Sequence, residues 1–221
     1  MSIAFDNASS AKGAAVATIK WIHTAQANVV AVMALYSPGA NSASSAGLNN
    51  VAMTKMGIVK RTSGAQWMTI YTGSATSAGN LSCSATLGGS DTWPVGMVTY
   101  TGAADNAFGT GLSTQTASGA TNVNLSVSTQ AGQTVVTFMA MSVAASAVAS
   151  NGTQRLNVSS GSSYTLFGWD LPSGGNTTSF SVSLAAASVV LAGLGISASA
   201  VSVSSPPAIV PYSLRLLGVG L

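Results

Sequence analysis

Apolar and polar residues alternate along most of this chain, which is the pattern of β-strands that bury one face. The alternation is clearest over residues 81–87 and 180–184 and recurs over 14–24, 66–72 and 122–127. Three further runs are apolar almost throughout, as expected of strands covered on both faces: 28–36, 133–143 and 188–196. Turns rich in glycine, proline and serine separate these runs. The pattern predicts roughly ten to twelve short strands in an all-β, antiparallel β-sandwich.

The stretch 91–102 is predicted to contain the central strand. Trp93-Pro94 fixes an extended entry, and residues 95–101 have the composition of a strand. Other predicted strands precede and follow this stretch, so we expect it near the middle of a sheet. One face would carry Val95, Met97 and Thr99, and the other Gly96, Val98 and Tyr100. By contrast, 57–64 is predicted to be a basic connector and 102–119 a long polar loop.

The chain changes character after Val203. Ser204-Ser205-Pro206-Pro207 cannot join a central strand, and the residues beyond it are strongly apolar. We therefore predict a β-sandwich domain over 1–203 and an extended, proline-containing C-terminal tail or arm over 204–221. The tail either docks on a partner or forms the last strand of its own sandwich, and the sequence leaves both open. The candidate partner-docking residues are Ile209, Val210, Tyr212, Leu214, Leu216 and Leu217.

Charge is scarce, which narrows the fold class and the partners. Only 5% of the 221 residues are charged, and the formal net charge is +3 with no glutamate. Long surface helices need a polar, usually charged face, whereas strands can use serine, threonine and asparagine. The few cations are scattered, and the one adjacent pair, Lys60-Arg61, is interpreted as a solvated turn. We therefore expect no nucleic-acid partner.

Two segments bear on membranes and export. Residues 184–203 contain no charge, but the alternation that enters this run, its glycines and its serines favour a strand over a transmembrane helix. We therefore expect no membrane partner. The N-terminal residues lack the basic start and apolar core of a signal peptide. A role outside a cell would then require another route of release, such as lysis with a virus particle.

Candidate chemistry is sparse, and we predict no enzymatic activity, no cofactor and no metal site. His23, the sole histidine, alternates with apolar neighbours, which favours a structural histidine over a catalytic base. Cys83, the sole cysteine, is predicted to be a buried thiol. Asp91 and Asp105 border the central strand and the stretch after it, where aspartate is ordinary turn chemistry and a calcium site is the weaker interpretation. The tryptophans could form a sugar platform if exposed, but core packing is the favoured prediction: Trp21, Trp67, Trp93 and Trp169.

Several stretches together resemble a loose group of domains. They are the start Ile-Ala-Phe-Asp-Asn-Ala-Ser-Ser, the apolar strand 29–36, Val51-Ala-Met-Thr-Lys-Met, the strand 67–71 and Val98-Thr-Tyr-Thr-Gly. In this order they are similar to jelly-roll-like β-sandwich domains of bacteriophage virion proteins and bacterial surface proteins. The likeness covers roughly residues 2–200. It consists of residues that pack in the core and includes no catalytic residue. It implies a structural or adhesive module.

The resemblance, the sparse charge and the apolar tail favour a non-enzymatic virion structural protein. We expect a capsid decoration or cement protein, or a head-fibre subunit, on the phage particle surface. Its partner would be the major capsid protein or another virion protein, and the chain itself is expected to form a homo-oligomer. The alternative is a carbohydrate-binding or adhesin module, on a phage fibre or extracellularly on a bacterial surface, with a glycan as ligand.

Overall fold

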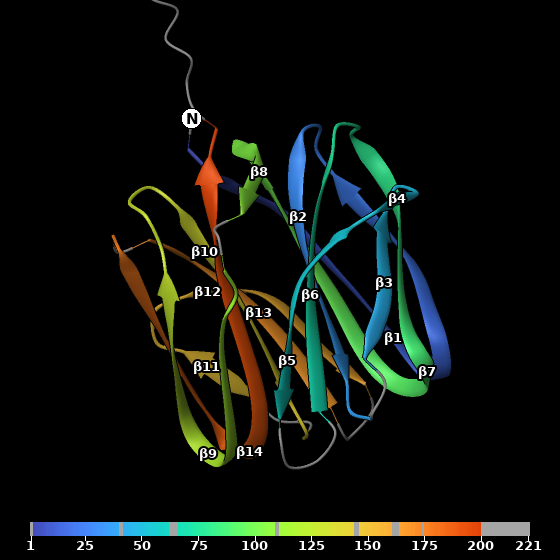
Figure 1. The fold of residues 1–221 in the computed structure, drawn as a ribbon, viewed down its shortest axis with the longest axis vertical. Coiled ribbons are helices and arrows are strands. Elements are labelled where there is room, and N and C mark those ends of the chain that lie inside the picture. Colours follow the sequence, from blue (N-terminus) through green and yellow to red (C-terminus); the bar gives the residue numbers. More distant parts are fainter. Residues whose placement is uncertain are drawn as a thin grey trace, which may run out of the picture.

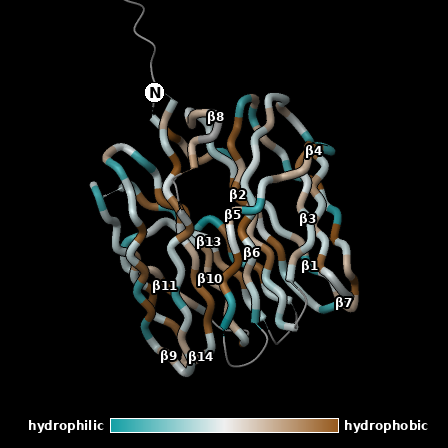
Figure 2. The backbone as a smooth tube through the Cα atoms, in the orientation of Figure 1, coloured by the Kyte–Doolittle hydropathy of each residue, from teal (hydrophilic) through white to brown (hydrophobic). Residues whose placement is uncertain are grey.

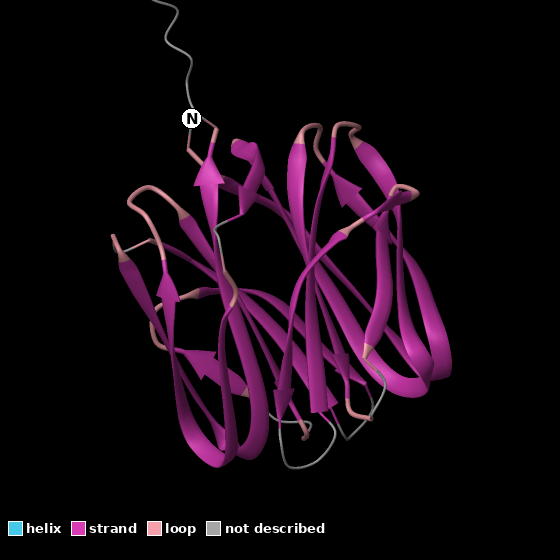
Figure 3. Cartoon of the chain, in the orientation of Figure 1, coloured by secondary structure: helices cyan, strands magenta, loops and turns pink. Residues whose placement is uncertain are grey.

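The computed structural model describes residues 2–39, 42–61, 66–108, 111–143, 146–160, 164–173 and 175–199. These residues form strands joined by turns, with no helix among them (Figure 3). The predicted tail and the predicted domain boundary at 203–204 lie outside the described residues. The strands of the first half are β1 (Ala4–Ala25), β2 (Val29–Ser37), β3 (Ala43–Leu48), β4 (Val51–Ala52), β5 (Thr54–Arg61), β6 (Gln66–Ala75) and β7 (Gly79–Thr101). Those of the second half are β8 (Ala103–Phe108), β9 (Ser113–Ser128), β10 (Thr134–Met141), β11 (Ala147–Ala149), β12 (Thr153–Ser160), β13 (Tyr164–Pro172) and β14 (Thr177–Ala198).

The strands form two seven-stranded antiparallel sheets that pack against each other (Figure 1). The first sheet has the order β4-β3-β7-β2-β6-β5, with β1 also paired to β7. The second has the order β11-β14-β10-β13-β12, with β8 and β9 also paired to β14. The predicted all-β antiparallel sandwich is confirmed. The connectivity was not predicted: the chain completes one sheet before it begins the other. No helix of membrane-spanning length and apolarity occurs within the described ranges.

The predicted central strand is confirmed in β7. This strand pairs with β1 along most of its length, with β3 near its start and with β2 near its end. Val95 and Met97 point into one apolar cluster, whereas Val98 and Tyr100 point into another. The alternation read from the sequence therefore places the two faces of this strand correctly.

Several predicted boundaries are wrong, because paired strands continue through residues that resemble turns. The predicted strand at 14–24 is the last part of β1, which begins at Ala4, and 81–87 joins the central strand in β7. The β1–β7 ladder absorbs the break as bulges around Gly13 and Val16. The predicted connector 57–64 lies partly in β5, and the predicted loop 102–119 is mostly β8 and β9. Each of these polar segments pairs with a longer strand, which supplies its backbone hydrogen bonds.

The two sheets repeat one strand arrangement. In each, a long strand (β1 or β9) pairs with the last strand of its half (β7 or β14). In the first half, β7 also pairs with β2, and the order continues through β6 to β5. In the second half, β14 also pairs with β10, and the order continues through β13 to β12. A short strand, β3 or β11, pairs with the edge of β7 or β14 that lies opposite β1 or β9. The described residues therefore form two halves with the same strand arrangement, and the two halves pack against each other.

The register of the ladders supports this equivalence. Gly13 pairs with Trp93 and Val16 with Asp91 in the first half; Ala117 pairs with Val189 and Ala120 with Ala187 at the matching positions of the second. Between these matched positions, Ala15 and Gly119 both have positive φ, at 54° and 61°. The edge strands match as well, since β5 bulges between Lys55 and Gly57, and β12 between Gln154 and Leu156. We define equivalent residues of the two halves by these registers.

Three apolar clusters hold the described fold together, and Figure 2 shows the apolar positions concentrated along the inner strands. One cluster lies on the far face of the first sheet, where β1 and β7 curl over it, and one lies in the same place in the second half. The third lies between the sheets and takes residues from both, among them Val98, Val136 and Leu194. The two halves therefore share one core.

Cys83 lies in the first of these clusters, with 3% of its surface exposed. Burial raises the pKa of its thiol to about 12, so the reactive thiolate is scarce at neutral pH. The prediction of a buried thiol is confirmed. We expect a thiol reagent to label the folded chain only after denaturant is added, and fast labelling of the native protein would contradict the placement. Mass spectrometry of samples with and without denaturant measures this.

Candidate functional site

The tryptophans mostly serve the core, as predicted. Trp93 and Trp169 are buried, and Trp169 stacks on Phe167 with ring centroids 5.3 Å apart. Trp67 is partly buried beneath Lys60, whose Nζ lies 4.4 Å from the centre of the ring. Trp21 is also partly exposed, and no coplanar pair of exposed tryptophans occurs among the described residues. A sugar platform built from several tryptophans is therefore not formed there.

His23 lies in a chain of hydrogen bonds inside the first half. The indole N–H of Trp21 donates to Ser9 Oγ at 3.0 Å, and Ser9 Oγ lies 2.7 Å from His23 Nδ1. On the other side of the ring, Nε2 lies 2.9 Å from Thr99 Oγ1, whose hydroxyl donates to Asp6 Oδ2 at 2.9 Å. These roles are complementary for a neutral imidazole that donates from Nε2 and accepts at Nδ1.

This chain of serine, histidine and aspartate has a structural role. His23 is 0% exposed and both ring nitrogens are occupied, which confirms the prediction of a satisfied structural histidine. Ser9 comes from the first part of β1 and His23 from its last part, so the contacts tie the two ends of one strand across the curl. The sequence could not show this, because Ser9 and Asp6 have no distinguishing pattern.

His23 should make stability depend on pH. Burial lowers its pKa from the ordinary value of 6.5, while nearby Asp6 raises it by less. The folded state therefore holds a neutral ring, and the unfolded chain binds the extra proton as pH falls below about 6.5. We expect the free energy of unfolding to be smaller at about pH 5 than at about pH 7.5. His23→Gln should reduce this difference, and an unchanged difference in urea titrations of the variant would contradict the assignment.

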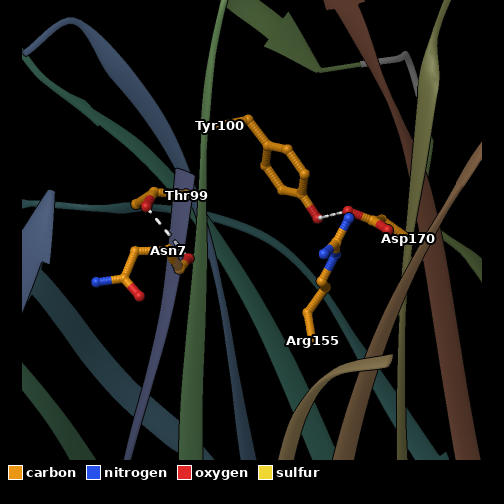
Figure 4. A network of polar contacts seen from close by, with 5 residues as sticks. All are labelled: Asn7, Thr99, Tyr100, Arg155 and Asp170. Carbon is orange, nitrogen blue, oxygen red and sulfur yellow. Dashed lines mark hydrogen bonds and ion pairs between the residues drawn. The ribbon is translucent and has the colours of Figure 1, made fainter. Parts of the chain in front are cut away.

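A second polar group lies between the sheets, on the opposite side of β7 from Thr99 (Figure 4). Arg155 Nε donates to Asp170 Oδ2 at 2.9 Å, and the Tyr100 hydroxyl donates to the same oxygen at 3.3 Å. The guanidinium also lies over the ring of Phe5, 4.1 Å from its centre. Burial, and then Asp170, raise the pKa of Tyr100 well above its ordinary value. These residues line a hollow of about 240 Å³.

The equivalent place in the first half is a larger groove without charged side chains. Met56 occupies the β5 bulge that matches Arg155, and Thr72 matches Asp170 through its pairing with Thr54. Phe108 and Ile196 pair there much as Phe5 and Tyr100 do in the other half. The groove has a volume of about 360 Å³ and contains no charged side chain in its lining. The two equivalent hollows thus differ in size and lining: one is lined by an ion pair, and the other is larger and has no charged side chain.

An added hairpin deepens this groove. Asn49 and Asn50 have positive φ of 51° and 64°, as a two-residue type I′ turn requires, and join β3 to β4. The hairpin brings Leu48, Val51 and Met53 to the groove. Val51 is 63% exposed, one of the most exposed large apolar side chains of the described residues. We call the space lined by Val30, Val51, Met53, Met56, Thr72 and Phe108 the β4 groove.

Comparisons with models of known families, with curated proteins and with solved structures find no match for this chain. Within the described ranges no group of three or more histidine, cysteine or acidic residues is placed to hold a metal ion. The weaker calcium interpretation included Asp91, which instead accepts hydrogen bonds from Ser37 Oγ and the Thr92 amide. The strongest candidate for a functional site is therefore the β4 groove together with the apolar C-terminal segment.

The predicted partner-docking residues, 209–217, lie outside the described residues, so the structure does not place them. It does describe the region that precedes them. Within the described residues, both sheets and the three apolar clusters are formed by residues up to Ala198. Sequence reasoning missed the β4 groove, although the exposed alternation at Val51-Ala-Met-Thr-Lys-Met and the Asn49-Asn50 turn signal were present.

Proposed function

We propose that this chain is a non-enzymatic structural protein of a bacteriophage particle, acting as a capsid decoration or cement protein or a head-fibre subunit. It would bind a capsid or tail lattice through residues 209–217. The observation that carries the proposal is the arrangement of the chain. The described residues form a two-sheet core, and a strongly apolar segment comes after them in the sequence. Such a segment gains free energy by docking on another surface, roughly 1.5–3 kcal/mol for each large side chain buried.

The surface of the sandwich supports the same proposal. The outward positions of β9 and of the first part of β14 are serine, threonine and asparagine, as in Asn122, Asn124, Ser126, Ser179 and Ser183. With so little charge, free copies gain little solubility from mutual repulsion. A subunit held in an assembly does not depend on that repulsion.

Cosedimentation with phage particles tests the proposal. Particles that lack the protein should bind the full chain, and a variant deleted for residues 205–221 should remain in the supernatant. Ile22→Ser, which changes an exposed residue of β1, is the matched control and should bind like the parent. Binding of the deleted variant at the level of the full chain would remove the segment from the proposal. Failure of the full chain to bind any particle would overturn the proposed function.

One observation favours a glycan-binding module as the second candidate. A shallow surface hollow of about 470 Å³ is lined by Trp21, Lys20, Asn50 and Ser82, among others. A partly exposed indole beside amide, hydroxyl and ammonium groups matches the chemistry of sugar recognition. Screening the chain against a glycan array, with Trp21→Ala as the control, tests it. Binding that Trp21→Ala abolishes would support this candidate, and the absence of any bound glycan would end it.

A further inference from the structure

The β4 groove leaves apolar side chains exposed to solvent, and a bound segment would bury them. In the second half, the equivalent hollow is smaller, about 240 Å³, and is lined by the Arg155–Asp170 pair and Phe5. In the first half, Met56 and Thr72 leave that volume open, and the added hairpin exposes Val51 along its rim. The Asn49-Asn50 turn brings these apolar side chains together at the surface, and an exposed apolar surface of this kind is typical of a docking site. The two equivalent hollows differ in volume and in charged lining residues, so the larger, uncharged groove is specific to the first half.

The described chain ends beside this groove. The amide of Ser199 donates to the carbonyl of Gly102 at 2.9 Å, and its hydroxyl donates to the carbonyl of Ala103 at 2.7 Å. Ser199 and Ala103 line a small hollow of about 210 Å³ together with Val30 and Ser74. Val30 and Ser74 also line the β4 groove, so the two spaces adjoin. The chain therefore leaves the sandwich next to the open groove.

The remaining sequence suits the groove in length and chemistry. Residues 200–208 can span roughly 30 Å when extended, which is more than an adjoining space requires. Pro206-Pro207 favours an extended backbone at the start of the apolar stretch. Strand β4 lies at the end of the first sheet's order, so its outer edge can accept another extended strand. The large apolar residues within 209–217, among which Arg215 is the one charge, match the uncharged lining, which includes Met53, Met56 and Phe108.

We propose that, in the free protein, the β4 groove holds the C-terminal segment (residues 206–221) of the same chain. The covalent link favours this segment over that of a second copy, because joining a segment and its site in one chain gives a local concentration of about millimolar. Its own segment therefore occupies the groove at ordinary protein concentrations. The inference depends on the proposed function in one respect only, namely that a lattice partner displaces the segment from the groove and binds it.

Cysteine protection in the free protein tests this inference. Val51→Cys places a thiol on the groove rim, and Cys83 is buried and gives little background. We expect a thiol reagent to label Val51→Cys about tenfold or more slowly in the full chain than after deletion of residues 205–221. Val148→Cys on β11 is the matched control, since Val148 is exposed to a similar degree, 68% against 63%. Its labelling rate should be the same in both lengths of chain.

The outcomes separate the alternatives. Protection of Val51→Cys that stays constant over roughly a hundredfold range of protein concentration supports the chain's own segment. Protection that grows with concentration assigns the groove to a second copy and overturns the proposal. Equal labelling of Val51→Cys in both lengths of chain also overturns it. Because no particle is used, these results are independent of cosedimentation, so this inference and the proposed function can fail separately.

Discussion

Val98→Asp is expected to abolish folding. Val98 is 1% exposed, lies in the cluster between the two sheets, and sits on the strand that pairs with β1, β2 and β3. A carboxylate there would lie among apolar side chains, and burying it costs several kcal/mol. The stability of a whole domain is about 5–15 kcal/mol. We therefore expect insoluble protein, or soluble protein without a cooperative unfolding transition.

The control variant introduces the same carboxylate at an exposed position outside the core. Ile22→Asp alters a residue of β1 that is 58% exposed, so its free energy of unfolding should change by no more than about 0.5 kcal/mol. Circular dichroism during heating measures both variants. Cooperative unfolding of Val98→Asp near the parent temperature would show that the shared core does not hold the two halves together.

Arg155→Met is expected to destabilise the fold by about 3 kcal/mol, because it leaves the Asp170 carboxylate buried without its cation. The Asp170 side chain is 9% exposed and that of Arg155 is 29% exposed, so we take the low end of the usual cost of breaking a buried pair. For a domain of this size the change corresponds to a melting temperature lower by roughly 10 °C. The substitution copies Met56, the equivalent residue of the first half.

The first half also provides the compensating change. Asp170→Thr copies Thr72, and in the double variant Arg155→Met with Asp170→Thr the buried charge is gone. Replacing both members of a buried pair is often neutral, whereas removing one is costly. We expect the double variant to recover more than half of the lost stability in urea titrations. A double variant that is less stable than Arg155→Met would contradict the equivalence of the two halves.

Fold class was predictable from the sequence because burial tracks the alternation so closely. Residues 29–36 and 189–196 of the two apolar runs are buried on both faces, and Val123, Leu125 and Val127 alternate with exposed residues as predicted. The central position of β7 was predicted from the same pattern. These predictions rest on the alternation of neighbouring residues, which local sequence carries directly.

Strand ends were poorly predicted, because long strands continue through residues typical of turns. Gly88-Gly89-Ser90-Asp91 reads as a turn, yet β7 passes through it and the ladder with β1 absorbs the irregularity. The polar stretch in β9 reads as a loop, yet β14 supplies its pairing partners. Pairing between segments far apart in the sequence determines where these strands end, and the strand propensity of neighbouring residues does not reveal that pairing.

The repeated strand arrangement and the β4 groove could not be predicted for a related reason. Equivalent positions hold different residues, as Met56 and Arg155 show, so the halves share registers and bulges rather than sequence. The groove combines the β3–β4 hairpin with Phe108 from the second half of the chain. Only the packing of the two halves brings these together.

The melting temperature of a chain that ends at Ser204 shows whether the residues before Ala200 form the complete sandwich. If they do, the C-terminal segment is a docking element and lies outside the core. We then expect cooperative unfolding within about 4 °C of the full chain, the modest loss expected when a weakly held segment is removed. An unfolded chain, or one that melts more than about 10 °C lower, would show that the segment belongs to the core and would contradict its role as a docking element.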